Sequence, residues 1–195
     1  MKILIASSNQ HKVREIREIF RIPGLELLST ADFRDLPEII EDADTFAGNA
    51  LKKSRTLCDA TGICALGDDS GLEVDALGGA PGIHSARYAG THGDDAANRA
   101  KLLADMKGRA DRGAQFHCSV AISTPDGRDF TVEGICRGKL LDCERGAGGF
   151  GYDSMFVPEG FEGTFAEITP EEKNSVSHRG RALAAAESVI RSVLI

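Results

Sequence analysis

Two adjacent aspartates, Asp68 and Asp69, stand before a serine and a glycine-rich run in the segment LGDDSGLEVDALGGAPG, residues 66–82. They follow a short apolar strand pattern, and open α/β sheets usually bind ligands beyond the carboxyl ends of their strands. A second acidic group consists of Glu38, Glu41, Asp42 and Asp44. Two sources of carboxylates suit one hard divalent cation. The alternatives are an Asx-type turn for the aspartates and a solvated face for the acidic group.

The segment SSNQHK, residues 7–12, has the opposite chemistry. It is a polar turn between a predicted strand and a predicted helix, so its amides and the helix N-terminus would point towards an anion. Lys12 would add a positive point charge. The segment lacks the glycines of a P-loop, and a simple helix N-cap is the alternative. Further cations occur at Lys52, at Lys53 and in KNSVSHRG, residues 173–180.

The elements that must position these residues alternate between strand and helix in the first third of the chain. Apolar runs and helical periodicity predict a strand at 2–6, a helix at 9–20, a strand at 25–29, a helix at 46–60 and a strand at 63–66. Thr45 is the expected N-cap of the second helix, and Gly62 is its stop signal. The last strand ends at the aspartates, and the glycine-rich stretch from there to Gly93 is expected to be a loop.

The rest of the chain adds antiparallel pairing to this pattern. A helix is predicted at 94–106, a hairpin of strands 115–124 and 128–140 around the turn PDG, a strand at 155–157, and a final helix after Ser177 with Leu183, Ile190 and Leu194 on its apolar side. Helices interleaved with strands at both ends, with a hairpin in the centre, predict an α/β protein with a mixed sheet.

The composition is that of an ordinary folded protein with an acidic surface. The 195 residues are 42% hydrophobic and 27% charged, which fits one domain over residues 1–195. The net charge of −7 argues against a nucleic-acid partner, because phosphate affinity comes from clustered Lys and Arg. No apolar stretch approaches the roughly 20 residues of a membrane span, and residues 3–6 are too short for a signal-peptide core. We therefore expect no membrane partner and a cytoplasmic location.

The cysteines do not form a recognisable framework. They stand at Cys58, Cys64, Cys118, Cys136 and Cys143, with no C-x-x-C pair. Neither disulfides nor a thiolate zinc site is predicted, and most of them are expected to be buried small hydrophobes. His117 and Cys118 would point to opposite faces of a strand, so they are not predicted to form a nucleophile pair.

Five segments stand out when they are taken together: SSNQHK, TFAGNALKKS, DDSGLEVDALGGAPGIHSARYAG, GGFGYD and EEKNSVSHRG. In this order and spacing, from Ile3 to about Leu183, the chain resembles the inosine triphosphate pyrophosphatase family. The resemblance implies magnesium-dependent hydrolysis of dITP, ITP and XTP to the monophosphate and pyrophosphate, by an enzyme that is usually a homodimer. It also implies an elongated mixed β-sheet with flanking helices that form two lobes around a central cleft.

The resemblance implies roles for individual residues as well. Asp69 matches the family's catalytic base, and Glu41 with Asp69 matches its Mg²⁺ ligands. The residues that match its substrate-binding positions are Ser7, Ser8, Asn9, Gln10, His11 and Lys12 in the triphosphate turn, Lys53 and Ser70 at the phosphates, Phe150, Gly151, Tyr152 and Asp153 at the base, and Lys173, His178 and Arg179 around the oxygen of the six-membered ring. Phe150 would stack on the purine.

The acidic group departs from the family pattern. Ile40 and Ala43 replace an expected glutamate and glycine, so Glu38 and Asp42 remain alternatives to Glu41 as the metal ligand. A cation lying between the two adjacent aspartates would let them tolerate each other. A carboxylate there could orient and deprotonate a water for attack at the α-phosphorus.

A nucleic-acid-binding module is one rival function, and the net charge of −7 and the absence of a basic stripe with interleaved aromatics argue against it. Two further rivals have their own distinguishing features. A related enzyme could use the same metal apparatus on a different nucleotide, but the base-binding segments FGYD and SHRG are both present. Donors at the purine 6-oxygen would favour inosine and xanthine over adenine. A non-catalytic nucleotide sensor would be favoured by loss of Asp69 or of the acidic group, and both are present.

Overall fold

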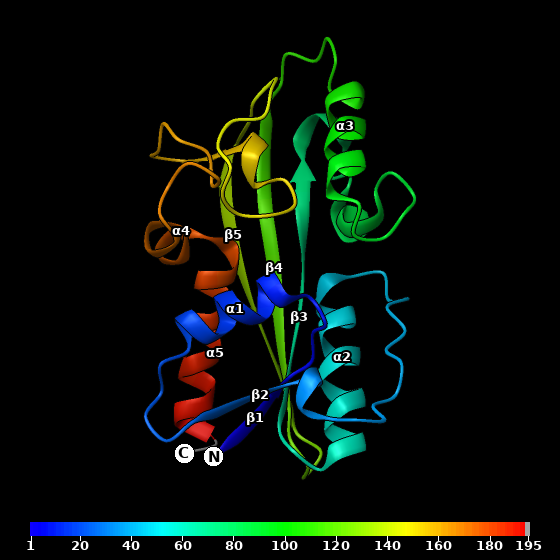
Figure 1. Ribbon diagram of the computed structural model, residues 1–195, viewed down its shortest axis with the longest axis vertical. Helices are drawn as coiled ribbons and strands as arrows, with labels where there is room; N and C mark the ends of the chain where they lie inside the picture. Colours follow the sequence, from blue (N-terminus) through cyan, green and yellow to red (C-terminus); the bar gives the residue numbers. More distant parts are fainter. Residues whose placement is uncertain (194–195) are drawn as a thin grey trace. The chain divides into compact units, whose positions relative to one another are not determined.

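The protein is described here by a computed structural model that covers residues 1–193 (Figure 1). Its helices and strands follow in chain order: β1 (Lys2–Ile5), α1 (Gln10–Ile19), β2 (Glu26–Ser29), α2 (Phe46–Thr61), β3 (Ala65–Val74), α3 (Asp95–Asp105), β4 (Gly113–Ser123), β5 (Asp129–Leu140), β6 (Phe156–Pro158), α4 (Pro170–Val176) and α5 (His178–Val193). Leu194, which the sequence pattern assigns to the last helix, lies outside the described residues.

The strands form one six-stranded sheet in the order β2-β1-β3-β4-β5-β6. Strand β1 is parallel to both β2 and β3, whereas β6 is antiparallel to β5. Strands β4 and β5 are joined by a tight turn in which the amide of Thr124 donates to the carbonyl of Arg128 at 3.0 Å. The predicted mixed sheet and its central hairpin are confirmed.

By its internal contacts the chain divides into two compact units. The first unit contains residues 1–69, 118–134 and the described residues from Arg179 onward, and the second contains residues 70–117 and 135–178. Three boundaries fall inside β3, β4 and β5, and the fourth lies at the start of α5. The prediction of a single domain over residues 1–195 stays a prediction.

In the first unit, helices cover both faces of β1. Ile3 and Ile5 pack with the apolar residues of α1 and α5, while Leu4, which points to the opposite face, packs with Leu57 of α2. Figure 1 shows α2 on one side of β1 and β3 and α1 with α5 on the other. Thr45 caps α2 by accepting a hydrogen bond from the amide of Gly48, and Gly62 ends the helix in the left-handed conformation, as the sequence predicts.

In the second unit, three phenylalanines from different strands and loops form the centre of the core. The rings of Phe116 and Phe156 meet edge to face with centroids 4.9 Å apart, and Phe165 stacks on Phe116 at 5.8 Å. Helix α3 contributes Leu102 and β3 contributes Leu72 to the same cluster. This core supports the loops that follow β5.

Strand β3 is longer than the sequence predicts, and this changes the position of the aspartates. It continues to Val74, so Asp68 and Asp69 lie inside the strand rather than at its carboxyl end. The reason is its neighbours: β1 pairs with β3 only as far as Leu66, but β4 continues beside it. Two internal glycines disfavour a strand, yet sheet pairing outweighs that local preference. The expected loop from Asp68 to Gly93 begins only after Val74 and contains two 3₁₀-helices.

Helix α4 was not predicted, although the sequence contains its signal. Thr169 and Glu172 form a capping box around Pro170 at the first helical position. Ser177 then separates α4 from α5, which begins at His178, as expected for the final helix.

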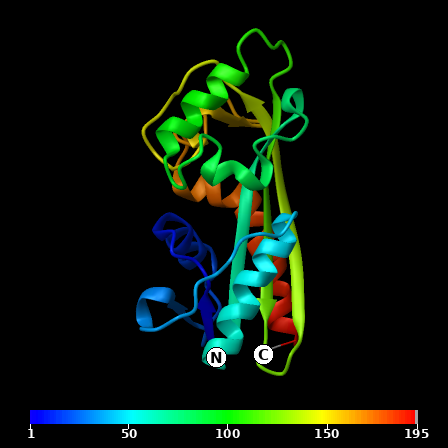
Figure 2. The same ribbon diagram turned by 90° about the vertical axis from the view of Figure 1, so that its right-hand side faces the viewer.

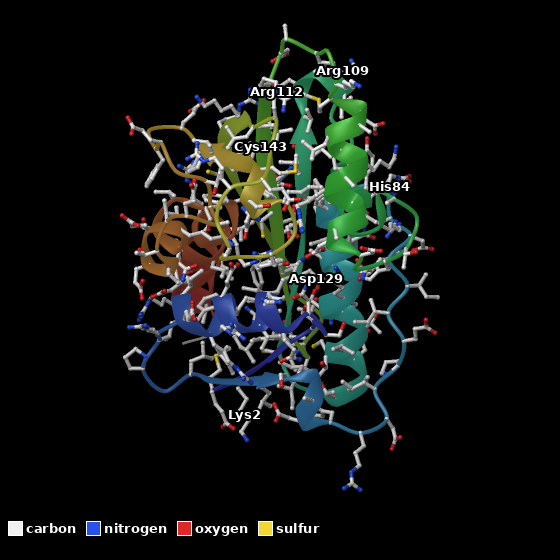
Figure 3. The ribbon with its side chains drawn as sticks, turned by 45° about the horizontal axis from the view of Figure 1, so that its top comes forward. Lys2, His84, Arg109, Arg112, Asp129 and Cys143 are labelled. Atoms are coloured by element: carbon white, nitrogen blue, oxygen red, sulfur yellow. The ribbon has the colours of Figure 1, made fainter. Side chains whose placement is uncertain are left out.

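Most of the cysteines are buried, as the sequence predicts. All five are free; Cys58, Cys118 and Cys136 are buried, and Cys143, labelled in Figure 3, is exposed. Among the described helices, none combines the length and the apolar character needed to cross a membrane.

Candidate active site

Asp68 is the centre of a buried charge network in the first unit. Only 1% of this residue is exposed, and its carboxylate accepts hydrogen bonds from Arg179 Nε at 2.9 Å and Cys118 Sγ at 3.0 Å. Lys12 Nζ lies 2.5 Å from the same carboxylate. Burial alone would raise the pKa of Asp68, but Arg179 and Lys12 outweigh it and hold that pKa well below its usual value. Arg179 and Lys12 therefore favour the charged form of Asp68.

Arg179 has a second anionic partner in this network. Its Nη1 donates to Glu15 of α1 at 2.5 Å, and the residue is 2% exposed. Burial disfavours the charged form, yet Asp68 and Glu15 raise the pKa of Arg179 well above its usual value. Arg179, which the sequence assigns to base recognition, thus joins α5 to α1 and β3. Its contact with a base stays a prediction.

Asp69 has different partners from Asp68 because adjacent residues in a strand point to opposite faces. Its carboxylate accepts from Lys53 Nζ at 2.9 Å and from Asn49 Nδ2 at 3.2 Å. Asn49 and Lys53 are four residues apart on α2 and so share one face of the helix. All three side chains are buried. Helix α2 therefore presents two donors to the carboxylate expected to act as the base.

The separate partners correct the expectation that one cation lies between the two aspartates. Lys12 and Arg179 balance Asp68, whereas Lys53 balances Asp69. Since both carboxylates lie inside β3 and accept from side chains, the Asx-turn alternative is also wrong. The two charges are adjacent in sequence but are neutralised on opposite faces of the strand.

Glu41 is brought to the same cation as Asp69. Its Oε2 lies 2.8 Å from Lys53 Nζ, which is itself 2.9 Å from Asp69 Oδ1. Burial would lower the pKa of Lys53, but the Asp69 and Glu41 carboxylates together raise it. Glu38 is exposed, and Asp42 pairs with the exposed Lys52. Of the three candidate metal ligands, only Glu41 therefore shares a partner with Asp69.

The Glu41–Asp69 pair suits magnesium. No group of three or more potential ligand side chains occurs among residues 1–193. Mg²⁺ usually takes one or two carboxylates and completes its shell with water and substrate phosphates, so it does not require such a group. Two carboxylate oxygens that converge on one positive charge match that requirement.

The turn at residues 7–12 is a capped helix start. Asn9 Oδ1 accepts from the amides of His11 at 3.0 Å and Lys12 at 3.3 Å, and Ser7 Oγ accepts from the amide of Asn9 at 3.2 Å. Gln10 donates to the carbonyl of Ser8 at 3.5 Å. The N-cap interpretation is thus confirmed. Binding of a triphosphate by this turn stays a prediction.

The segment Phe150–Asp153, expected to bind the base, belongs to the second unit and is folded around Asp153. Asp153 Oδ2 accepts from the amide of Phe150 at 2.9 Å and from Lys173 Nζ at 2.6 Å. Lys173 Nζ also lies 4.9 Å from the centroid of the Phe150 ring. Tyr152 donates to the carbonyl of Ser85 at 2.8 Å. The predicted residues Phe150, Tyr152, Asp153 and Lys173 are therefore brought together.

The remaining predicted residues are divided between the units. His178 is buried in the second unit and stacks on Phe116 with ring centroids 4.7 Å apart. Ser70 lies half-buried in β3 and also belongs to the second unit, whereas Arg179 belongs to the first. Each residue's contact with substrate stays a prediction.

Two residues of the site were missed from the sequence. Asn49 could have been found, because its spacing of four from Lys53 places both on one helical face. No local sequence pattern pointed to Glu15, because its partner Arg179 stands 164 positions further along the chain.

The chain is similar to proteins named as nucleotide pyrophosphatases. The model of a family described as the Ham1 family matches residues 3–189. The dITP/XTP pyrophosphatase of Desulforamulus reducens is 47% identical over 100% of this chain and 98% of its own. That of Desulfotalea psychrophila is 50% identical over 93% of this chain and 82% of its own. The solved structure of a HAM1 protein from Coxiella burnetii is 36% identical, covers 99% of this chain and 100% of its own, and has a TM-score of 0.90.

Proposed function

Because the chain belongs to the Ham1 family, we propose that it hydrolyses the non-standard purine nucleoside triphosphates dITP, ITP and XTP to the nucleoside monophosphate and pyrophosphate. Two relatives that are 47% and 50% identical to this chain are named dITP/XTP pyrophosphatase. The observation that carries the proposal is the convergence of Glu41 and Asp69 on Lys53. The two carboxylates could bind a cation, and the buried ammonium group of Lys53 could bind a phosphate.

Magnesium is the proposed cofactor, held by Glu41 and Asp69. When bound, it would screen the charge of the phosphates and make the phosphorus more accessible to a nucleophile. The carboxylates supply hard oxygen ligands, and Asn49 fixes the orientation of the Asp69 carboxylate by its hydrogen bond to Oδ2. Glu38 and Asp42 are not proposed as ligands.

Asp69 is the proposed general base. Its carboxylate would accept a proton from the attacking water as the oxygen of that water bonds to the α-phosphorus. The bond from this phosphorus to the oxygen that bridges to the β-phosphate then breaks, and pyrophosphate leaves with that oxygen. Lys53 and Lys12 would stabilise the charge that develops on the leaving group. Lys53 is ready for this role because its ammonium group is already desolvated.

Base recognition is proposed for Phe150 to Asp153 together with Lys173 and His178. The Phe150 ring would stack on the purine, and donors of the set would pair with its 6-oxygen. Adenine has an amino donor at that position and would leave such donors unmatched. The close grouping of Phe150, Asp153 and Lys173 supports this part of the proposal.

The remaining assignments follow the same family. We propose a cytoplasmic homodimer that acts on the nucleotide pool and has neither a nucleic-acid nor a membrane partner. The net charge of −7 supports the absence of a nucleic-acid partner.

The test is hydrolysis of dITP, XTP, dGTP and dATP with magnesium, with release of monophosphate, pyrophosphate and single phosphate followed separately. We expect pyrophosphate from the first two substrates, and about 10²-fold to 10⁴-fold slower turnover in Asp69→Asn. The control is Asp59→Asn, an exposed carboxylate on α2 that should leave turnover unchanged. Release of single phosphate would contradict attack at the α-phosphorus. Binding without turnover would support a sensor instead.

A further inference from the structure

Helix α3 holds one residue of the segment Phe150–Asp153 from two sides. Asp95 Oδ2 accepts a hydrogen bond from the amide of Gly151 at 2.8 Å, and Arg99 Nη1 donates to the carbonyl of Gly151 at 3.0 Å. Asp95 and Arg99 are four residues apart and so lie on one face of α3. Figure 2 shows α3 (green) beside the loop that carries this segment (yellow), and all these residues belong to the second unit.

Neither side chain is needed to complete the helix itself. The N-cap of α3 is Asp94, whose Oδ1 accepts from the amide of Ala97 at 3.0 Å. The Asp95 carboxylate is therefore available for the loop. Arg99 is held in turn by Glu144, whose Oε2 accepts from Arg99 Nε at 2.8 Å and from Ser154 Oγ at 3.0 Å. Helix α3 thus contacts this loop at both Glu144 and Gly151.

Gly151 is the one glycine of the segment Phe150–Asp153, and its backbone is restrained by α3. Its φ of +59° is a left-handed conformation that glycine adopts readily, but glycine also loses the most conformational entropy when it is fixed. It has no side chain to pack, so its two backbone bonds to α3 are what restrain it. On its N-terminal side, the amide of Phe150 is fixed by Asp153 at 2.9 Å. The peptide groups on both sides of Phe150 are therefore fixed by hydrogen bonds, and this restrains the position of its ring.

We propose that Asp95 and Arg99 are positioning residues for base recognition, which act by fixing the peptide next to Phe150. The inference rests on the proposed function, because it takes Phe150 as the ring that stacks on the purine. A ring that is already in place binds a base without a further loss of conformational entropy, so α3 would contribute to affinity without contacting the nucleotide. Neither residue is assigned to the site by the sequence motifs.

The first measurement compares the kinetics of Asp95→Ala and Arg99→Ala with wild type on dITP and dATP. We expect KM for dITP to rise about tenfold, because each variant loses a hydrogen bond to a charged group, while kcat stays within about threefold. KM for dATP should rise by a similar factor, because the Phe150 ring would stack on either purine. Arg99→Lys should recover part of the loss, since it restores a donor.

The matched control is Arg109→Ala, which lies just beyond the other end of α3 and is labelled in Figure 3. Arg109 also donates to backbone carbonyls, those of Asp105 at 3.0 Å and Ala76 at 2.7 Å, but it does not contact the Phe150 segment. It should change neither KM nor selectivity. An equal effect in Arg109→Ala would mean that all three variants act through a general loss of stability, and this would overturn the inference.

The second measurement does not depend on activity. Hydrogen exchange of the peptide around residues 149–155, without nucleotide, should speed up in Asp95→Ala and Arg99→Ala but not in Arg109→Ala. Unchanged exchange, or faster exchange with unchanged KM, would overturn the inference. If wild type releases no pyrophosphate from dITP, the proposed function fails, and the exchange experiment alone decides whether α3 holds the segment.

Discussion

Lys53 is the residue at which carboxylates from two parts of the chain meet. Glu41 lies in the segment before α2, and Asp69 lies in β3, yet both contact the same ammonium group. A buried lysine between two acids is stable as an ion pair, and the same arrangement brings two oxygen ligands together. This geometry reduces the three candidates for the second metal ligand to Glu41.

We therefore predict that Glu41→Gln raises the magnesium concentration needed for half-maximal activity by about tenfold or more. Loss of an outer partner of a metal site already costs about 10-fold to 100-fold in affinity, and loss of a carboxylate ligand should cost at least as much. Asp42→Asn is the control, because Asp42 pairs with the exposed Lys52. A magnesium titration of the hydrolysis rate gives the comparison. The opposite ranking of the two variants would assign the ligand to Asp42.

At the level of elements, the packing of β3 against α2 determines the position of these groups. A Cβ atom on Gly67 would overlap the carbonyl oxygen of Ala50 and lie 2.9 Å from the amide nitrogen of Ser54. The strand can approach α2 this closely only because residue 67 has no side chain. The donors Asn49 and Lys53 reach Asp69 across this contact.

Gly67→Ala should therefore separate α2 from β3. We expect a loss of about 1–3 kcal/mol in the free energy of unfolding, as for other overpacked sites. We also expect a loss of about tenfold or more in kcat/KM, because displaced catalytic groups are costly. Gly163→Ala is the control, since a Cβ there would be 3.5 Å from its nearest neighbours, an ordinary contact. Urea unfolding and hydrolysis of dITP measure both effects, and normal activity in a destabilised Gly67→Ala would contradict the positioning role.

Sequence patterns predicted the elements better than the contacts between them. Capping residues such as Thr45 and Gly62 act within a few positions, so the ends of α2 could be predicted. The length of β3 depends on pairing with β4, which a local pattern does not contain. The partner of Asp68 is likewise remote, since Arg179 stands 111 positions away. The sequence singled out Asp68 and Asp69 as candidates, but their different partners followed only from the strand geometry.

At the level of the whole chain, the Asp68 network connects distant segments of the first unit. It joins Lys12 and Glu15 of α1, Asp68 of β3, Cys118 of β4 and Arg179 of α5. Its carboxylates and cations are mostly excluded from water, so removal of one member leaves another charge buried without its partner. The network should accordingly contribute to the global stability of the fold.

Arg179→Met should lower the free energy of unfolding by about 3–5 kcal/mol, the usual cost of breaking a buried ion pair. The control on the same helix is Arg191→Met, whose partner Glu187 lies one turn away and whose side chain is half exposed. That variant should stay within about 0.5 kcal/mol of wild type. Equal losses in urea unfolding would contradict a structural role for Arg179. Any effect of Arg179→Met on base selectivity must be measured under conditions in which the urea unfolding curve shows that the variant is folded.

The interleaving of the two units has a consequence for recombination. Residues 70–117 and 135–178 are each inserted between segments of the first unit, so neither unit corresponds to one continuous stretch of coding sequence. A single crossover with the gene of a relative, anywhere between codons 70 and 178, would leave both units with residues from both parents. An exchange of the second unit alone would require four crossovers, within the codons of β3, β4 and β5 and at the start of α5. Homologous recombination is therefore not expected to replace the second unit intact with that of a relative.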